Sequence, residues 1–266
     1  MMIKCNNWIL IEKYKKEREE YEEYVSRINK EKILFAKSKL DEKDIEILKM
    51  INKLKITTSN QLAKIIYKNS KFSNRYINNK LNKLFKLGCI DRFFPAKDKG
   101  SYPVHVVLAK IGAKILNIES FRIMTVLNQK WKHKVAINEV LAEILYKYKV
   151  KICRFEMWVD KDKTRTDMFV IWVKENKVHA AFFEIDMGTE NLKEVENKIK
   201  KYINYFKHDS YKTADWQPYL NKNISITPKI FFIFNNEERK QKFKKILSKY
   251  NSTLKFEVEN LNDLNL

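Results

Sequence analysis

Residues 164–206 read TRTDMFVIWVKENKVHAAFFEIDMGTENLKEVENKIKKYINYF, which predicts two apolar strands, a short turn and a helix. The strands are expected at about 165–173 and 177–186, with the turn around Glu175 and Asn176. A two- or four-residue turn centred there fixes the register. It pairs three sets of apolar residues: Phe169 with Phe182, Ile171 with Ala180, and Val173 with Val178. The same register places Asp167 opposite Glu184, and Arg165 opposite Asp186. An odd loop length would turn every side chain to the other face.

Three carboxylates on this hairpin need an explanation: Asp167, Glu184 and Asp186. Like charges opposite one another destabilise a sheet, and burying them costs more. A divalent cation such as Mg²⁺ or Mn²⁺ removes both penalties, because hard cations take carboxylate ligands. Alternatively, Arg165 neutralises Asp186, and the other two carboxylates lie at a solvated end of the sheet. The strands are apolar on both faces, as central strands are, and this favours a metal site.

The composition points to an anionic partner. The 266 residues carry a formal net charge of +21, which favours nucleic acid, with an anionic membrane surface as the alternative. No apolar run reaches the roughly 18–20 residues of a membrane span. The chain start lacks the apolar length of a secretory signal. The cysteines, Cys5, Cys89 and Cys153, show no zinc or disulfide spacing, which fits core positions and a reducing cytoplasm.

The chain divides into three parts. Residues 1–39 form a charged N-terminal segment, with a solvated helix expected over 8–32. Residues 40–118 predict a winged helix-turn-helix: helices that begin near Asp41, after Thr58 or Ser59, and at Ser73. Gly88 is expected to end the third helix, and Gly100 to supply the turn of a two-stranded wing.

The third helix and the wing would bind double-stranded DNA. Arg and Lys can reach guanine edges or phosphates, and Asn can pair with adenine in the major groove. The candidate residues are Arg75, Asn78, Asn79, Lys80, Lys83, Arg92, Lys97 and Lys99. Two alternatives are a solvated helix in a basic protein and a winged helix that binds protein. Winged-helix proteins often dimerise, so a homodimer is also an expectation.

Residues 129–266 predict a third part with the element order α-β-β-β-α-β, followed by a further α-β pair. The helix after the third strand is expected to cross over to a neighbouring parallel strand at 230–234. The predicted fold class is therefore α/β (α+β overall), with an N-terminal winged helix-turn-helix followed by a domain with a mixed central sheet.

This order, with Asp on the second strand and Glu on the third, resembles the restriction-endonuclease-like fold of PD-(D/E)XK nucleases. The winged helix, the R-T-D at 165–167, the F-E-I-D-M-G-T-E at 183–190 and the K-I-x-x-Y at 198–202 together resemble the plasmid replication-relaxation family, which includes MobC-type relaxases. HKVAIN at 133–138 also resembles the family pattern. The resemblance implies a plasmid or integrative element, and action at an origin of transfer or replication beside other mobilisation or replication proteins.

The resemblance also implies roles for single residues. Asp167 and Glu184 would be metal carboxylates, binding Mg²⁺ or Mn²⁺. The nuclease motif has Lys two residues after the Glu, but this chain has Asp186, which would be a third metal ligand. Lys198, on the next helix, is the candidate to replace that lysine, or else a solvated side chain. The accessory candidates are His133, Arg165 and Tyr202, of which His133 would bind metal or phosphate or be structural, and Tyr202 would pack the helix.

Two functions remain open from the sequence. The first is a metal-dependent, site-specific DNA nickase or relaxase-like enzyme. The second is a catalytically inactive DNA-binding factor that accompanies or regulates plasmid replication, transfer or transcription. Asp186 at the lysine position supports the second, and the retained carboxylates support the first.

Overall fold

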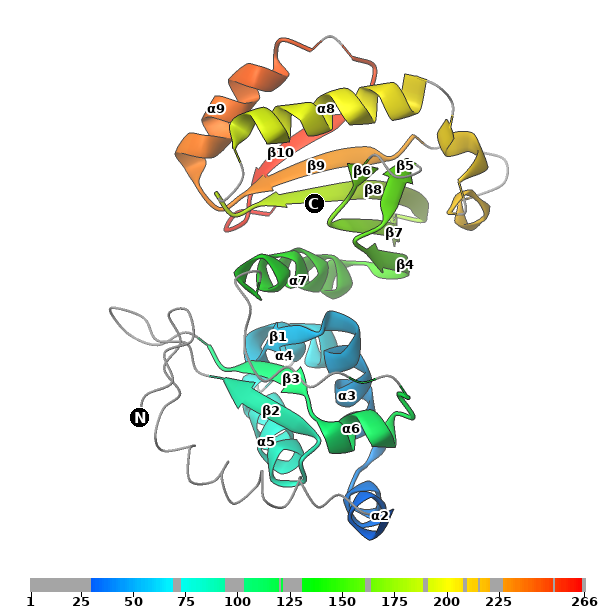
Figure 1. The fold of residues 1–266 in the computed structure, drawn as a ribbon, viewed down its shortest axis with the longest axis vertical. Coiled ribbons are helices and arrows are strands. Elements are labelled where there is room, and N and C mark those ends of the chain that lie inside the picture. Colours follow the sequence, from blue (N-terminus) through cyan, green and yellow to red (C-terminus); the bar gives the residue numbers. More distant parts are fainter. Residues whose placement is uncertain are drawn as a thin grey trace. The chain divides into compact units, whose positions relative to one another are not determined.

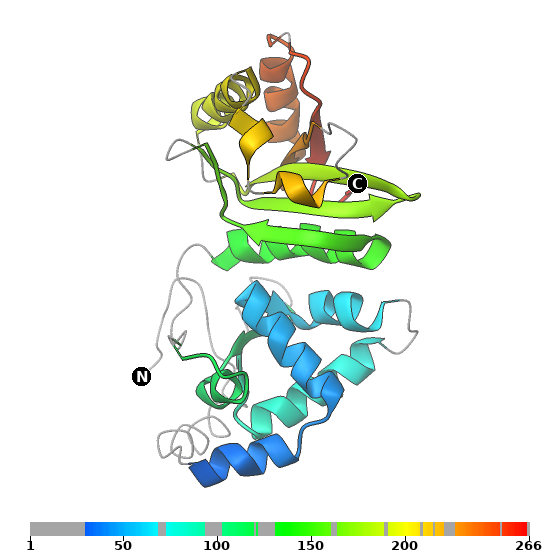
Figure 2. The ribbon, with the colours of Figure 1, turned by 90° about the vertical axis from the view of Figure 1, so that its right-hand side faces the viewer.

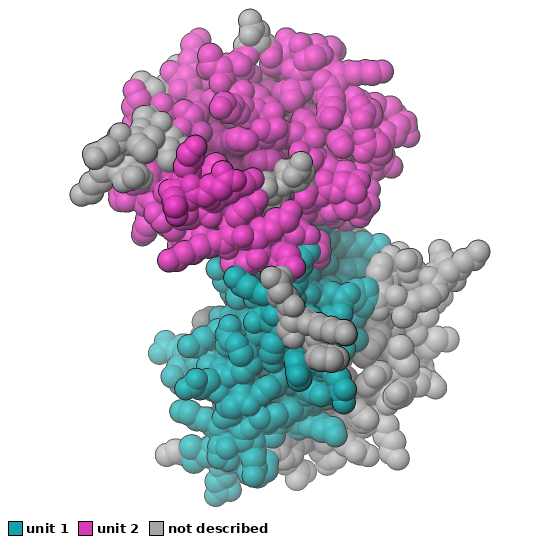
Figure 3. Space-filling model, turned by 180° about the vertical axis from the view of Figure 1, so that it is seen from behind, with its two compact units in different colours: residues 1–138 teal, residues 139–266 magenta. Residues whose placement is uncertain are grey.

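The computed structural model describes residues 30–68, 73–93, 103–119, 121, 131–160, 164–188, 191–207, 210–214, 216–220, 227–250 and 252–264. The expected helix over 8–32 falls almost entirely outside these residues, as does the wing turn with Gly100. The chain forms two compact units, residues 1–138 and residues 139–266, which Figure 3 colours separately. The described residues contain eight α-helices, one five-stranded sheet, one three-stranded sheet and one two-stranded sheet (Figure 1). None of these helices has the length and apolar character needed to cross a membrane.

The first unit begins with helices whose starts follow from their capping residues. After α2 (Lys30–Ser38), Asp41 caps α3 (Glu42–Leu54) in a capping box with Asp44. Thr58 caps α4 (Ser59–Tyr67) in the same way with Gln61. The predicted third helix is α5 (Ser73–Lys86), and Gly88 follows it with a φ of 72°, as a C-terminal glycine should.

A small antiparallel sheet completes the first unit together with α6 (Lys110–Ile115). Its strands are β1 (Ile56–Thr58), β2 (Ile90–Phe93) and β3 (His105–Leu108), and β3 lies between the other two. The buried faces of the helices form one core with this sheet, and Cys89 lies in that core as a buried free thiol, as predicted. Burial raises the pKa of the Cys89 thiol to about 12.

A buried amide holds the first half of α7 (Trp131–Lys147), which belongs to the first unit. Asn138 is 2% exposed, and its side-chain nitrogen donates hydrogen bonds to the backbone oxygens of Leu54 and Ile56. The Leu54 carbonyl lies in the last turn of α3, where no helical partner satisfies it, and Ile56 begins β1. Asn138, the last residue of the family-like segment HKVAIN, therefore has a structural role.

The second unit is built on a mixed sheet in the order β10-β9-β8-β7-β4. Its strands are β4 (Lys149–Phe155), β7 (Met168–Lys174), β8 (Lys177–Asp186), β9 (Lys229–Phe234) and β10 (Phe256–Asn260). β7 pairs antiparallel with β4 and β8, whereas β8, β9 and β10 are parallel. The crossover prediction is confirmed, because β9 lies beside β8 after the intervening helix.

The hairpin register is confirmed at every predicted apolar pair. Phe169 lies opposite Phe182, and Lys174 opposite Lys177 closes a two-residue turn. Glu175 and Asn176 have φ angles of 49° and 59°, the left-handed conformation that suits a twisted two-residue hairpin.

One predicted pairing is wrong. The sequence predicts a first strand of this part at about 150–159, but β4 ends at Phe155, and Glu156 turns the chain with a φ of 49°. A short hairpin follows, in which β5 (Trp158–Asp160) pairs with β6 (Thr164–Arg165). Arg165 therefore lies opposite Trp158 and not opposite Asp186.

Two helices cover one face of the large sheet. Figure 2 shows α8 (Leu192–Lys207) and α9 (Glu237–Leu247) on the same side of it. Their buried side chains pack with alternate residues of the strands and with two 3₁₀ turns, η1 (Ser210–Thr213) and η2 (Gln217–Tyr219). Phe169, Phe182 and Phe232 all belong to this core, so odd-numbered residues of β7 and even-numbered residues of β8 face α8 and α9.

We expect Asn138→Ala to lower the free energy of unfolding by about 1–3 kcal/mol, because it strands two buried carbonyls. Asn79→Ala, on the exposed face of α5, is the matched control, since it brings the same gain in helix propensity without losing a buried hydrogen bond. Urea denaturation measures both. An Asn138→Ala protein as stable as the control would contradict the assigned role.

Candidate functional site

Glu184 lies near the end of β8, with its side chain buried under α8. It is 2% exposed, and it pairs with Phe232 in the parallel register. The Tyr202 hydroxyl donates a hydrogen bond of 2.6 Å to its Oε1, and the Lys198 Nζ lies 3.0 Å from its Oε2. Lys198 and Tyr202 are four residues apart on α8, so one helix face presents both groups to the carboxylate.

Burial dominates the chemistry of this carboxyl. It raises the pKa of Glu184 to about 7, and the opposing pull of Lys198 and the Tyr202 hydroxyl offsets this only in part. The Lys198 contact lies outside hydrogen-bond geometry, so Oε2 has no hydrogen-bond partner among the described residues. This oxygen meets the Lys198 ammonium as an ion pair, and it keeps lone pairs that a metal ion can use.

Asp167 lies beside Glu184, as the register predicts. It directly precedes β7, one position beyond the Met168–Phe183 pair. Its Oδ2 accepts a 2.8 Å hydrogen bond from the Ile185 backbone nitrogen, which fixes the carboxylate across the hairpin. The negative charge of Asp167 contributes to the raised pKa of Glu184, so the two groups are electrostatically coupled.

Asp186 has a different environment. It is 5% exposed, its Oδ2 accepts a 2.6 Å bond from the Arg239 Nε, and its Oδ1 accepts one of 2.6 Å from the Gly188 nitrogen. Its neutralising partner is therefore Arg239 of α9, not Arg165. Arg239 was not among the predicted site residues, although a signal existed: α9 directly follows β9, the strand that was expected beside β8.

The three carboxylates do not converge on one point. Within the described residues, no group of three or more His, Cys, Asp or Glu side chains is placed to hold a metal ion. The structure brings together Asp167 and Glu184, with Lys198 and Tyr202 around Glu184. Asp186 forms a separate pair with Arg239.

The accessory candidates take structural positions. Tyr202 is fully buried and packs against Phe182, as predicted, and burial beside Glu184 raises its pKa well above the usual value. Arg165 is exposed and pairs with Glu156 at 2.6 Å. His133 lies half-buried in α7 within the first unit.

The predicted DNA-binding residues of α5 differ in their contacts within the protein. Arg75, Asn78 and Asn79 are exposed. Lys80 and Lys83 instead form ion pairs with the buried Asp44, at 3.0 and 2.6 Å.

Of the three DNA-binding candidates in the predicted wing, the structure describes Arg92. The Arg92 guanidinium packs over the Phe85 ring at 4.2 Å and donates a hydrogen bond to Asn82. Lys97 and Lys99 lie outside the described residues.

The replication-relaxation family model matches residues 48–217, which is more than half of the chain. The chain belongs to the replication-relaxation family. The match includes α5, α7, the β7–β8 hairpin and α8, and therefore Asp167, Glu184, Lys198 and Tyr202. Arg239 lies beyond the matched residues. No curated protein and no solved structure matches the chain.

The raised pKa of Glu184 predicts a pH-dependent stability. The ordinary value is 4.5 and the folded value about 7, so the folded protein holds an extra proton between these pH values. The contribution of protonated Glu184 to the free energy of unfolding is fully present below about pH 4.5, and it is lost as the pH rises through about 7. We expect Glu184→Gln, measured in EDTA, to gain stability relative to the unmodified protein between pH 5 and pH 8.5, by up to about 3 kcal/mol.

Glu175→Gln, in the exposed turn of the same hairpin, is the control and should follow the unmodified protein at every pH. Urea midpoints across the pH range give the comparison. A difference between Glu184→Gln and unmodified protein that does not change with pH would refute the burial argument.

Proposed function

We propose that this replication-relaxation protein binds a specific DNA site of a plasmid or integrative element and nicks it in a metal-dependent reaction at an origin of transfer or replication. The observation that carries the proposal is the Asp167–Glu184 pair. Two carboxylates meet across a hairpin, and one of them is buried with an oxygen that lacks a hydrogen bond among the described residues. The Lys198 ammonium offsets the charge of Glu184, and a divalent cation would offset the charges of both carboxylates.

Asp167 and Glu184 would hold Mg²⁺ or Mn²⁺. Magnesium commonly binds through one or two carboxylates together with substrate phosphate, so two protein ligands fit the ion. When bound, such an ion supplies a water of lowered pKa and offsets the negative charge of the phosphate. The raised pKa of Glu184 fits the same role, since a proton held near neutrality is released when a cation binds.

The surrounding side chains position these ligands. The Tyr202 hydroxyl holds one oxygen of Glu184 and leaves the other towards Lys198. Lys198 would replace the lysine that the nuclease motif has at position 186, by placing its ammonium beside the same glutamate. Arg239 holds the Asp186 carboxylate away from solvent, and the pair would fix the end of β8 below α9.

The first unit would select the DNA site. Its order α3-β1-α4-α5-β2-β3, with β3 between β1 and β2, supports the assignment as a winged helix, in which α5 is the recognition helix. Arg75, Asn78 and Asn79 are exposed on α5 and suit contacts with base edges. The order β4-β7-β8-α8-β9 in the second unit likewise supports a restriction-endonuclease-like fold.

A second function is favoured by one observation. Asp186 occupies the position of the motif lysine, so the lysine ammonium that the nuclease motif has there is missing. Both carboxylate oxygens of Asp186 already accept hydrogen bonds, from Arg239 and Gly188. The protein would then be an inactive DNA-binding accessory factor or regulator that keeps the nuclease fold. Nicking separates this function from the first.

The substrate is a supercoiled plasmid that carries the DNA next to the gene for this protein. We expect the full-length protein to convert this plasmid to open circles with Mg²⁺ or Mn²⁺, and not with EDTA. Asp167→Asn and Glu184→Gln should each lower the rate at least about 100-fold, in line with loss of a charged catalytic group. Glu156→Gln is the control, because that carboxylate pairs with Arg165 on the surface. Specific binding without nicking would replace the enzyme by the accessory factor.

DNA affinity tests the role of α5 separately. Arg75→Ala and Asn79→Ala should each weaken binding to the origin site by about 1–3 kcal/mol, or roughly 5- to 150-fold, while non-specific binding changes less. Lys177→Ala, in the hairpin turn of the second unit, makes the same charge change as Arg75→Ala and serves as control. Fluorescence anisotropy at fixed salt gives both affinities. Variants of α5 that bind like the control would exclude α5 as the reading helix.

A further inference from the structure

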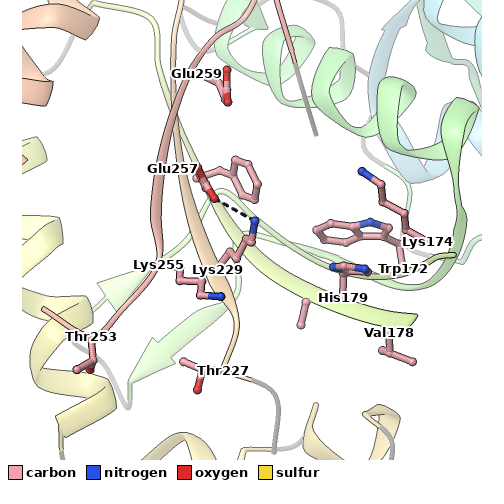
Figure 4. A pocket seen from close by; sticks show the side chains of 12 residues that line it. Trp172, Lys174, Val178, His179, Thr227, Lys229, Thr253, Lys255, Glu257 and Glu259 are labelled. Carbon is pink, nitrogen blue, oxygen red and sulfur yellow. Dashed lines mark hydrogen bonds and ion pairs between the residues drawn. The ribbon is translucent and has the colours of Figure 1, made fainter. Parts of the chain in front are cut away.

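A cavity of about 660 Å³ opens on the second unit, away from the carboxylate pair (Figure 4). Strands β7, β8, β9 and β10 line it. Phe231 and Glu257 point into it, whereas their neighbours Phe232 and Val258 face α8 and α9, so the cavity lies on the opposite face of the sheet. Its size falls within the range of small-molecule sites, roughly 300–1,000 Å³.

Flat aromatic groups form one end of the cavity. The Trp172 and His179 rings stack with centroids 5.6 Å apart and planes 18° apart. Figure 4 shows the two rings side by side, on neighbouring strands. Burial and the nearby Lys174 and Lys229 lower the pKa of His179, which favours the neutral ring.

The indole nitrogen of Trp172 is a buried hydrogen-bond donor that lacks an acceptor among the described residues. Trp172 is 4% exposed, and its Nε1 has no hydrogen-bond partner among the described residues. Buried donors of this kind nearly always have an acceptor. Trp172 lines the cavity, but its Nε1 is closed to solvent, so an acceptor atom on a ligand would reach this donor when the indole ring tilts towards the cavity.

Charged groups surround the other end. Lys229 pairs with Glu257 at 3.0 Å, while Lys255 lies exposed beside it and has no acidic partner in the described part of the chain. Glu259 stands further along β10. Ammonium groups suit a phosphate, and carboxylates accept hydrogen bonds from amino groups.

We propose that this cavity binds one nucleotide unit, with its base against Trp172 and His179 and its phosphate at Lys229 and Lys255. A base is flat, offers acceptors to the indole N–H and stacks on aromatic rings. The nucleotide is either free or part of an unpaired DNA strand, and the same groups would recognise both. The site is separate from Asp167 and Glu184, so the test of nucleotide binding does not depend on the nicking reaction.

Calorimetry on the full chain tests the site, with dAMP, deoxyadenosine and an oligo(dA) eight-mer as probes. We expect dAMP to bind more tightly than deoxyadenosine. Trp172→Phe keeps an aromatic ring but loses the donor, and should weaken dAMP binding about tenfold. Lys255→Gln, an exposed position that leaves the fold intact, should abolish most of the preference for dAMP over deoxyadenosine.

Lys177→Gln makes the same charge change outside the cavity and should bind as the unmodified protein does. The eight-mer measurements are made in a protein that also carries Arg75→Ala, which weakens DNA binding by α5. Equal site affinity for dAMP and the eight-mer would indicate a free nucleotide, and much tighter eight-mer binding an unpaired strand; both support the proposal. No binding of any probe at millimolar concentration, or binding unchanged in both Trp172→Phe and Lys255→Gln, would overturn it.

Discussion

The turn at Glu175 and Asn176 is the constraint on which the second unit depends. Both residues have left-handed backbone angles, and together they close β7 onto β8 without an extra residue. This register turns Phe169 and Phe182 into the core under α8, and it turns Glu184 and Asp186 to the same side. A slip of one residue would move the two carboxylates to the opposite face.

Two polar pairs make this placement tolerable. Glu184 sits between Lys198 and Tyr202 of α8, and Asp186 is bonded to Arg239 of α9. The two sites differ in how fully they are satisfied. Asp186 has hydrogen bonds to both oxygens, whereas one oxygen of Glu184 meets only an ammonium outside hydrogen-bond geometry. The incomplete site is the one beside Asp167, and it is the one to which we assign the cation.

Local patterns predicted much of this arrangement. Capping residues located the starts of α3 and α4, and the turn fixed the hairpin pairs and brought Asp167 to Glu184. The family resemblance made Lys198 a candidate for this site, but the hydrogen bond from Tyr202, which was expected only to pack the helix, was not predicted.

Tertiary pairing explains what the sequence did not predict. Arg165 leaves the sheet because Glu156 turns the chain and a separate hairpin forms. Arg239 comes from a helix 53 residues beyond Asp186. The sequence did not predict the ion pairs of Lys80 and Lys83 with the buried Asp44, because they form only when α3 and α5 pack together.

The central claim is that Asp167 and Glu184, and not Asp186, hold a divalent cation. Direct titration of the full chain with Mn²⁺, followed by electron paramagnetic resonance, measures this without any DNA. The account predicts binding by the unmodified protein, loss of binding in Asp167→Asn and in Glu184→Gln, and retained binding in Asp186→Asn. Binding that survives in Asp167→Asn and Glu184→Gln, or that is lost only in Asp186→Asn, would contradict it.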